Sequence, residues 1–140
     1  MKVIWSPDAA DWVAGQIPGC DRGFGANRSA FVVDSKEIAA GVVFHNWSPT
    51  SEVIEISAAA ANPKWFTRSV MEELLNYAFA GCGCQLVVAR MSENNTRARR
   101  LWRALGSNEY VIPRLYGRDV AEAVMTLADD DWQCSKFRRS

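Results

Sequence analysis

Histidine is nearly absent from this sequence, because the 140 residues contain only one, together with four cysteines. The close cysteine pair, Cys82 and Cys84, is separated by a single glycine, whereas metal-binding and redox hairpins usually place two residues between their cysteines. A structural zinc site needs about four histidine or cysteine ligands. We therefore expect no metal ion, and we interpret the cysteines as reduced, mostly buried thiols.

A net charge is also absent, since sixteen Lys and Arg balance sixteen Asp and Glu. No overall field attracts the chain to nucleic acid or to an anionic membrane, so any such contact has to be local. The longest uncharged stretch, residues 74–89, is interrupted by two glycines and two amide side chains and falls short of a membrane span. Asp8 comes too early for a signal peptide. These features predict a cytoplasmic protein without a membrane partner.

Hydrophobic residues make up 49% of the chain and charged residues 23%, which is typical of a folded protein rather than a disordered or fibrous one. A chain of this length forms one ordinary domain and is too short for two good cores. We expect one domain over residues 1–132 and a C-terminal tail at 133–140.

Periodicity and turn residues divide the chain into strands and helices. Strands are expected at residues 2–5, 29–34, 38–47, 52–60, 85–91, 109–115 and 121–127. Helices are expected at residues 8–17, 69–79 and 95–105. This order predicts a mixed α/β (α+β) sheet of six to seven strands flanked by about three helices. The strands at 52–60 and 85–91 would form its one parallel crossover.

Details of two elements lead to further expectations. Ser69 and Glu72 have the spacing of a capping box, which predicts that the second helix begins at Ser69. The strand at 85–91 is almost wholly apolar, as is typical of a strand covered on both faces. The expected core consists of Ile54, Ile56, Leu74, Leu75, Val87, Leu101 and Leu105.

The segment at residues 95–107 carries a recognisable motif. Four of its fixed positions are Asn95, Ala98, Leu101 and Gly106. This spacing resembles the signature of the GNAT acyltransferase superfamily, which reads Asn, two residues, Ala, two residues, Leu-Tyr, three residues, Gly-Phe. Trp102 and Ser107 stand where that signature has its tyrosine and phenylalanine. The order of elements over nearly the whole chain resembles the GNAT fold as well.

The resemblance is closest to ribosomal-protein-type N-acetyltransferases and small phage-encoded members. It implies that acetyl-CoA is the co-substrate and that the acetyl group passes to an amine by direct attack in a ternary complex. Two alternatives stay open. One is a GNAT-like binding or interaction module that has lost catalysis, and the other is a phage-type enzyme that modifies a nucleic-acid base.

The resemblance also implies a donor site. The segment before the second helix stands where the family has a glycine-containing loop that cradles the pyrophosphate of coenzyme A. Trp65 and Thr67 occupy its two small-residue positions. Donor contacts are expected from Ser57, Ala58, Lys64, Trp65, Thr67, Arg68, Asn95, Arg99 and Trp102. Alternatively, the loop packs Trp65 and Phe66 into the core, Asn95 only caps its helix and Arg99 belongs to a solvated face.

Three residues are candidates for proton transfer. Glu55 lies mid-strand between two isoleucines, where the family often places a glutamate base, and a partly buried carboxylate there is suited to take a proton. His45, on the neighbouring strand, is the reserve candidate. Tyr116, with Tyr110 as the alternative, is expected to replace the acid that Trp102 cannot supply. The alternatives are an exposed strand face that includes Glu55, a hydrogen-bonded surface histidine and a packing tyrosine.

The resemblance implies that the acceptor is an amine on a small molecule or a peptide. The sequence predicts one helix between the first two strands where the family commonly has two, so the acceptor side is expected to be open. A homodimer that completes this side is one possibility, and a local nucleic-acid contact through the basic third helix is another.

Overall fold

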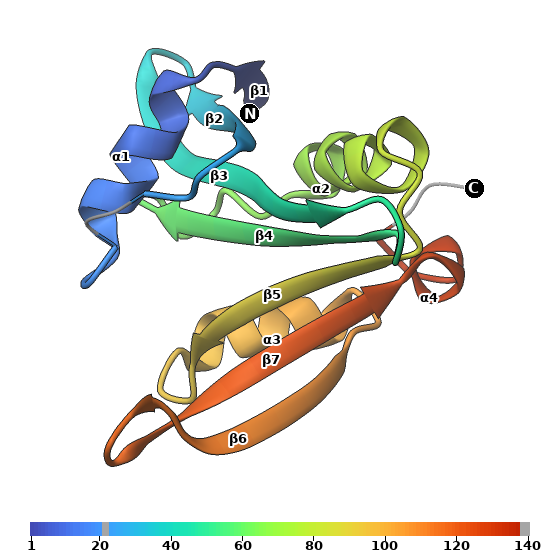
Figure 1. The fold of residues 1–140 in the computed structure, drawn as a ribbon. Helices are drawn as coiled ribbons and strands as arrows, with labels where there is room; N and C mark the ends of the chain where they lie inside the picture. Colours follow the sequence, from blue (N-terminus) through green and yellow to red (C-terminus); the bar gives the residue numbers. More distant parts are fainter. Residues whose placement is uncertain (21–22, 138–140) are drawn as a thin grey trace.

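The computed structural model describes residues 1–20 and 23–137, and in this part of the chain seven strands form one mixed sheet (Figure 1). The order across the sheet is β1-β2-β3-β4-β5-β7-β6. The strands are β1 (Lys2–Trp5), β2 (Asn27–Asp34), β3 (Glu37–Ser48), β4 (Val53–Ala60), β5 (Leu86–Ser92), β6 (Asn108–Gly117) and β7 (Val120–Ala128). All neighbouring strands are antiparallel except β4 and β5, which are parallel. The predicted sheet and its single parallel crossover are confirmed.

The helices form layers on the two faces of this sheet. They are α1 (Asp8–Gln16), α2 (Arg68–Asn76) with a π-helical turn η1 (Tyr77–Gly81), α3 (Thr96–Ala104) and α4 (Asp129–Gln133). Buried residues of α2 and α3 share one core cluster with Phe44 and Met125 of the sheet, whereas α1 packs against Val43 on the opposite face. About three helices were expected, and the short helix α4 is an additional one. The acidic residues 129–131 form its first turn, where the helix dipole favours negative charge.

Helix α1 lies unusually close to β3. A Cβ atom on Gly41 would stand 2.6 Å from a methyl carbon of Val13 and 2.8 Å from the ring of Trp12. Only a residue without a side chain fits at this crossing. The glycine therefore allows α1 to cover the N-terminal half of the sheet.

Helix α2 begins at Arg68, one residue before the predicted start at Ser69. Its N-cap is Thr67, whose side chain accepts a hydrogen bond from the amide of Val70 at 3.3 Å, and Ser69 lies inside the first turn. The expectation of a cap at Ser69 is wrong. Both hydroxyls are chemically suited to capping, and the extended backbone of Thr67 decides between them.

Strand β5 is covered on one face only. Val87, Ala89 and Met91 are buried under α2 and α3, but Val88 is half-buried and Arg90 is exposed. Figure 1 shows no described helix over the opposite face of β5, β7 and β6. The expected coverage of both faces is wrong, because α1 extends only over β2, β3 and the end of β4.

The core agrees with the predicted one at all residues except Leu101. Ile54, Ile56, Leu74, Leu75, Val87 and Leu105 are buried. Leu101 is half-buried, because it lines a cleft beside the core. In the described part of the chain, no helix is long and apolar enough to cross a membrane. The last tail residues, 138–140, lie outside the described residues.

Candidate functional site

The two parallel strands separate halfway along their length. Their pairing runs from Val53 opposite Leu86 to Ile56 opposite Ala89 and then ends. Beyond this point residues 57–60 of β4 pair only with β3, and residues 90–92 of β5 pair only with β7. Figure 1 shows the strands diverging away from α4. The facing edges of β4 and β5 thus open a gap in the sheet.

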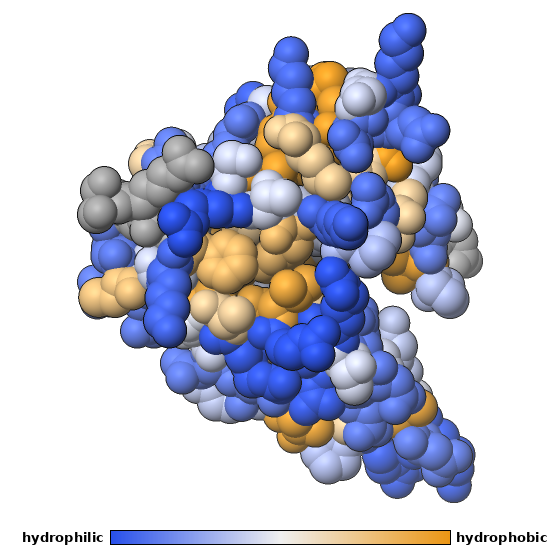
Figure 2. All heavy atoms as spheres, turned by 180° about the vertical axis from the view of Figure 1, so that it is seen from behind, coloured by the Kyte–Doolittle hydropathy of each residue, from blue (hydrophilic) through white to orange (hydrophobic). Residues whose placement is uncertain are grey.

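A cleft of about 930 Å³ occupies this gap. Residues 57–60 of β4 are one serine and three alanines, so small side chains border the widest part of the gap. On the side of α2 and α3 the cleft is lined by Phe66, Leu101 and Trp102, and Figure 2 shows apolar atoms in a hollow on this face with hydrophilic residues around it. On the other side it is lined by His45 and Phe24. The cleft therefore connects the two faces of the sheet.

A polar cluster stands where the strands separate. His45 is opposite Glu55 in the β3–β4 register, and Ser57 follows two residues later on the same face. Nε2 of His45 lies 2.8 Å from Oγ of Ser57 and 3.6 Å from Oε2 of Glu55. Sequence reasoning named both Glu55 and His45, and the strand register brings them together.

Three residues that the sequence analysis missed, Asn46, Arg90 and Glu122, complete this cluster. Nδ2 of Asn46 donates a hydrogen bond of 3.2 Å to Oε1 of Glu55. Nε of Arg90 lies 3.6 Å from the same oxygen, and Nη1 of Arg90 donates to Glu122 at 3.4 Å. The single charged residue within an apolar strand was a signal that could have identified Arg90. The position of Asn46 depends on a bulge that its residue type does not reveal.

Burial lowers the pKa of His45 below its ordinary value of 6.5. The negative charge of Glu55 raises this pKa, but the loss of solvation outweighs it, and the positive charge of Arg90 lowers the pKa further. The imidazole is therefore neutral at pH 7 and has a lone pair that can accept a proton or a hydrogen bond.

The predicted donor loop lies beside the cleft, and many of its polar groups already have partners. Asn62 accepts hydrogen bonds from the amides of Lys64, at 2.9 Å, and Trp65, at 3.2 Å. The amide of Thr67 donates to the carbonyl of Trp65 at 2.9 Å. The side chain of Trp65 is buried and forms part of the cleft wall. Of the loop residues expected to bind the donor, only Trp65 lines the cleft.

Arg68 is held by the C-terminal tail. Its Nη2 donates to the carbonyl oxygen of Lys136 at 2.8 Å. The ring of Phe137 packs on Phe66, with 5.8 Å between their centroids. Residues 136 and 137 therefore lie against the loop that leads into α2.

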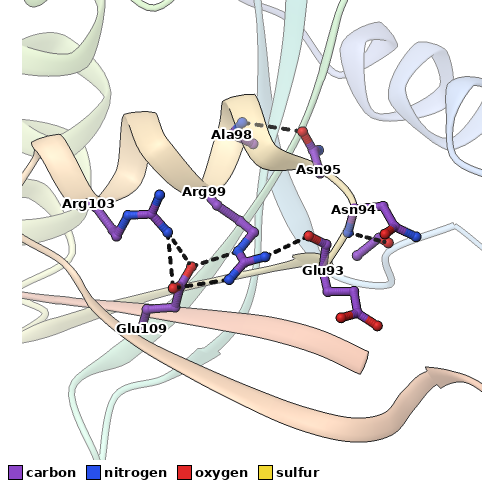
Figure 3. A network of polar contacts seen from close by, with 8 residues as sticks. Glu93, Asn94, Asn95, Ala98, Arg99, Arg103 and Glu109 are labelled. Atoms are coloured by element: carbon purple, nitrogen blue, oxygen red, sulfur yellow. Dashed lines mark hydrogen bonds and ion pairs between the residues drawn. The ribbon is translucent and has the colours of Figure 1, made fainter. Parts of the chain in front are cut away.

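Helix α3 and its N-cap bring two predicted residues, Asn95 and Trp102, to the cleft and turn a third away. The side chain of Asn95 caps the helix, accepting from the amide of Ala98 at 3.2 Å, and also lines the cleft. The guanidinium of Arg99 instead makes two hydrogen bonds to Glu109, at 2.8 and 3.2 Å, and Arg103 joins them (Figure 3). Hydrogen bonds from Arg99 hold the pKa of Glu109 below its usual value. Arg99 does not line the cleft.

The two aromatic candidates occupy different parts of the cleft. Trp102 is buried and packs edge-on against Phe66, with 6.2 Å between the ring centroids. Tyr116 lies at the mouth on β6 and is 50% exposed. The hydroxyl of Tyr116 can donate a proton, whereas the ring of Trp102 forms part of the cleft wall.

No family model matches the chain, and no curated protein matches its sequence. Solved structures match it in fold. A chimera of the spermidine N-acetyltransferase SpeG from Vibrio cholerae and hSSAT gives a TM-score of 0.75 at 14% identity, covering 96% of this chain and 99% of that one. The chain has the GNAT fold.

Other GNAT structures match over a shorter part of their length. The SpeG F149A mutant from Vibrio cholerae gives a TM-score of 0.66 at 19% identity and covers 77% of this chain and 69% of that one. YncA from Salmonella typhimurium, an assigned acetyltransferase solved with its cofactor acetyl-CoA, gives 0.61 at 20% identity and covers 73% and 64%. The chain spans 61% of the length of another assigned acetyltransferase, which it matches with a TM-score of 0.66.

Within residues 1–20 and 23–137, no group of three or more His, Cys, Asp and Glu side chains could hold a metal ion. The polar cluster at the strand separation contains one histidine and two glutamates, with Arg90 between the glutamates. Such a cluster is suited to proton transfer and hydrogen bonding.

Proposed function

We propose that the chain is an N-acetyltransferase that moves an acetyl group from acetyl-CoA to an amine within a ternary complex. The observation that carries this proposal is the cleft through the separated strands, with Glu55 and His45 at its narrow end. Two substrates can enter such a cleft from opposite faces of the sheet and meet beside a proton acceptor. Similarity in fold to SpeG and YncA supports the proposal.

The open strand edges fit the extended arm of coenzyme A. Residues 57–60 and 90–92 each pair with one neighbouring strand, so their other backbone edges face the gap. Backbone N–H and C=O groups in such a position require partners, and the amides of a pantetheine arm can supply them. Ser57, Ala58, Asn95 and Trp102 line this path.

The diphosphate end would lie at the start of α2. The first turn of a helix leaves its amides without intrahelical acceptors and attracts anions, which places Arg68 and Ser69 in suitable positions. Lys64 and Arg68 are the cations that the loop offers, and Arg68 would exchange the carbonyl of Lys136 for phosphate. Thr67 caps the helix, and we assign no donor contact to Arg99.

Acetyl-CoA supplies a thioester whose carbonyl carbon is attacked by the amine nitrogen, with formation of a C–N bond and loss of the C–S bond. Glu55 takes the proton from the amine, directly or through one water. Oε2 of Glu55 is the oxygen that faces His45, while Asn46 binds the other oxygen. Tyr116 donates a proton to the leaving thiolate, and neutral His45 is the reserve base.

The first test is an acetyl-transfer assay with acetyl-CoA and a panel of small-molecule and peptide amines. Glu55→Gln keeps the shape of the side chain and removes the proton acceptor, so the rate should fall by roughly 10²- to 10⁴-fold with little change in donor affinity. Release of free thiol measures the rate.

Glu109→Gln is the matched control, because Glu109 has the same 17% side-chain exposure as Glu55 and lies outside the cleft. It should retain the wild-type rate. Equal rates for Glu55→Gln and the wild type would remove Glu55 from the reaction, and failure of every amine would contradict the proposed activity.

A binding module without catalysis is the second candidate. It is favoured by the donor loop, in which Asn62 already accepts the amide hydrogen bonds of Lys64 and Trp65. Binding of acetyl-CoA without transfer to any amine would support it.

Four expectations from the sequence stay predictions. They are the closeness to ribosomal-protein-type and phage-encoded enzymes, the nucleic-acid contact, the cytoplasmic location and the single domain. SpeG is found as a dodecamer, and a homodimer of this chain stays a prediction too.

A further inference from the structure

A bulge interrupts β3 beside the cleft. His45 is opposite Glu55 and Ser48 is opposite Val53, so Asn46 and Trp47 together face the single residue Ile54. Asn46 has a φ of 53°, in the left-handed region that few residues other than glycine adopt. Asparagine tolerates this region better than most other residues.

The bulge changes the direction of one side chain. Consecutive residues of a regular strand point to opposite faces, so His45 and Asn46 would not reach the same carboxylate. Here Nδ2 of Asn46 lies 3.2 Å from Oε1 of Glu55, and Nε2 of His45 lies 3.6 Å from Oε2. Bulges occur often beside active sites, where they redirect a side chain.

We infer that Asn46 is a positioning residue, which the bulge of β3 directs onto Glu55 and which holds that carboxylate short of direct hydrogen-bonding contact with His45. Asn46 and Arg90 both approach Oε1 of Glu55, so Oε2 is left facing the imidazole of His45. His45 in turn contacts Ser57 at 2.8 Å. The role of Asn46 in catalysis rests on the proposed function, whereas its effect on Glu55 and His45 does not.

The single histidine provides a direct readout. Among the described residues, the charged groups that face it are Glu55 on β4 and Arg90 on β5, with Glu122 of β7 behind Arg90. NMR of the imidazole in the full chain, without any substrate, gives the pKa of His45 in each variant. The signal needs no assignment among histidines.

Asn46→Gly removes the amide and keeps the left-handed backbone, since glycine adopts positive φ freely. Glu55 is then free to approach His45, and the pKa of His45 should rise by about 0.5 unit or more. Glu55→Gln should lower this pKa, because it removes the charge that raises it. In the Glu55→Gln background, Asn46→Gly should leave the pKa unchanged, because its effect acts through the carboxylate.

Ser35→Gly is the matched control, since Ser35 also has a positive φ, of 57°, but lies in the turn between β2 and β3. It should leave the His45 titration unchanged. The inference is overturned if Asn46→Gly titrates like the wild type, or if it shifts the pKa equally with and without Glu55.

The test also separates this inference from the proposed function. A protein whose variants titrate as expected but which transfers no acetyl group would support the positioning role and contradict the activity. In an active protein, Asn46→Gly should lower kcat and leave the KM for acetyl-CoA unchanged, because Asn46 acts on the base rather than on the donor.

Discussion

Glu55 and Glu109 have the same side-chain exposure and different polar partners. Arg99 and Arg103 donate hydrogen bonds to both carboxylate oxygens of Glu109. Glu55 accepts one hydrogen bond, from Asn46, and Arg90 lies 3.6 Å from the same oxygen, while its second oxygen lies 3.6 Å from neutral His45 and has no arginine partner among the described residues. A carboxylate surrounded by arginines is a poor proton acceptor, so the surroundings rather than the residue type distinguish the candidate base.

Glu109 should make stability depend on pH. Its pKa is below 4.5 in the folded state because Arg99 and Arg103 stabilise the charged form. The unfolded chain takes up a proton first as the pH falls, so this stabilisation is present above pH 4.5 and is lost as the pH falls through the folded-state pKa. Urea unfolding of the wild type and Glu109→Gln should differ at pH 7, and the difference should shrink as the pH falls below 4.5.

Added salt should reduce the difference at pH 7, since these side chains are close to solvent. A difference that stays unchanged as the pH falls through the folded-state pKa of Glu109 would mean that Glu109 stabilises the fold through packing rather than through its charge.

Residue types predicted part of the cluster. Glu55 and His45 could be named because adjacent strands bring alternating positions together. Asn46 could not, because regular alternation points it to the other face and only the bulge reverses this. Arg99 was expected at the donor, but its guanidinium binds Glu109, which a helical pattern cannot foresee.

At the scale of elements, the apolar stripe of α3 packs into the core near its C-terminal end and lines the cleft one turn earlier. Leu105 is fully buried, whereas Leu101, one turn earlier, is half-buried and lines the cleft. The helical period predicts which residues share a face. It cannot predict where along the helix the core ends and the cleft begins, because that depends on where β4 and β5 separate.

Leu105→Ala should therefore destabilise the protein by about 2 to 5 kcal/mol, since it leaves a cavity in the core. Leu101→Ala removes a side chain that already borders open space, so its cost should stay below about 1.5 kcal/mol. The free energy of urea unfolding measures both. Equal costs for the two variants would place Leu101 in the core and contradict its position in the cleft.

At the scale of the molecule, the order of elements predicted the sheet and its parallel pair. Hydrophobic alternation located the strands, and the crossover followed from the helix between residues 60 and 85. The order of elements did not predict how far β4 and β5 pair along their length, because a strand of alanines pairs as well in one register as in another. The gap exists because β4 follows β3 and β5 follows β7 beyond Ile56 and Ala89.

Binding of acetyl-CoA in this gap is the central claim, and amide NMR of the labelled protein during a titration with acetyl-CoA tests it most directly. The account predicts saturable shifts at residues 57–60 and 90–92 with a Kd below about 1 mM. Ala58→Trp, which fills the gap from an exposed position, should abolish them. Absence of shifts at millimolar acetyl-CoA, or shifts confined to residues outside the gap, would contradict the account.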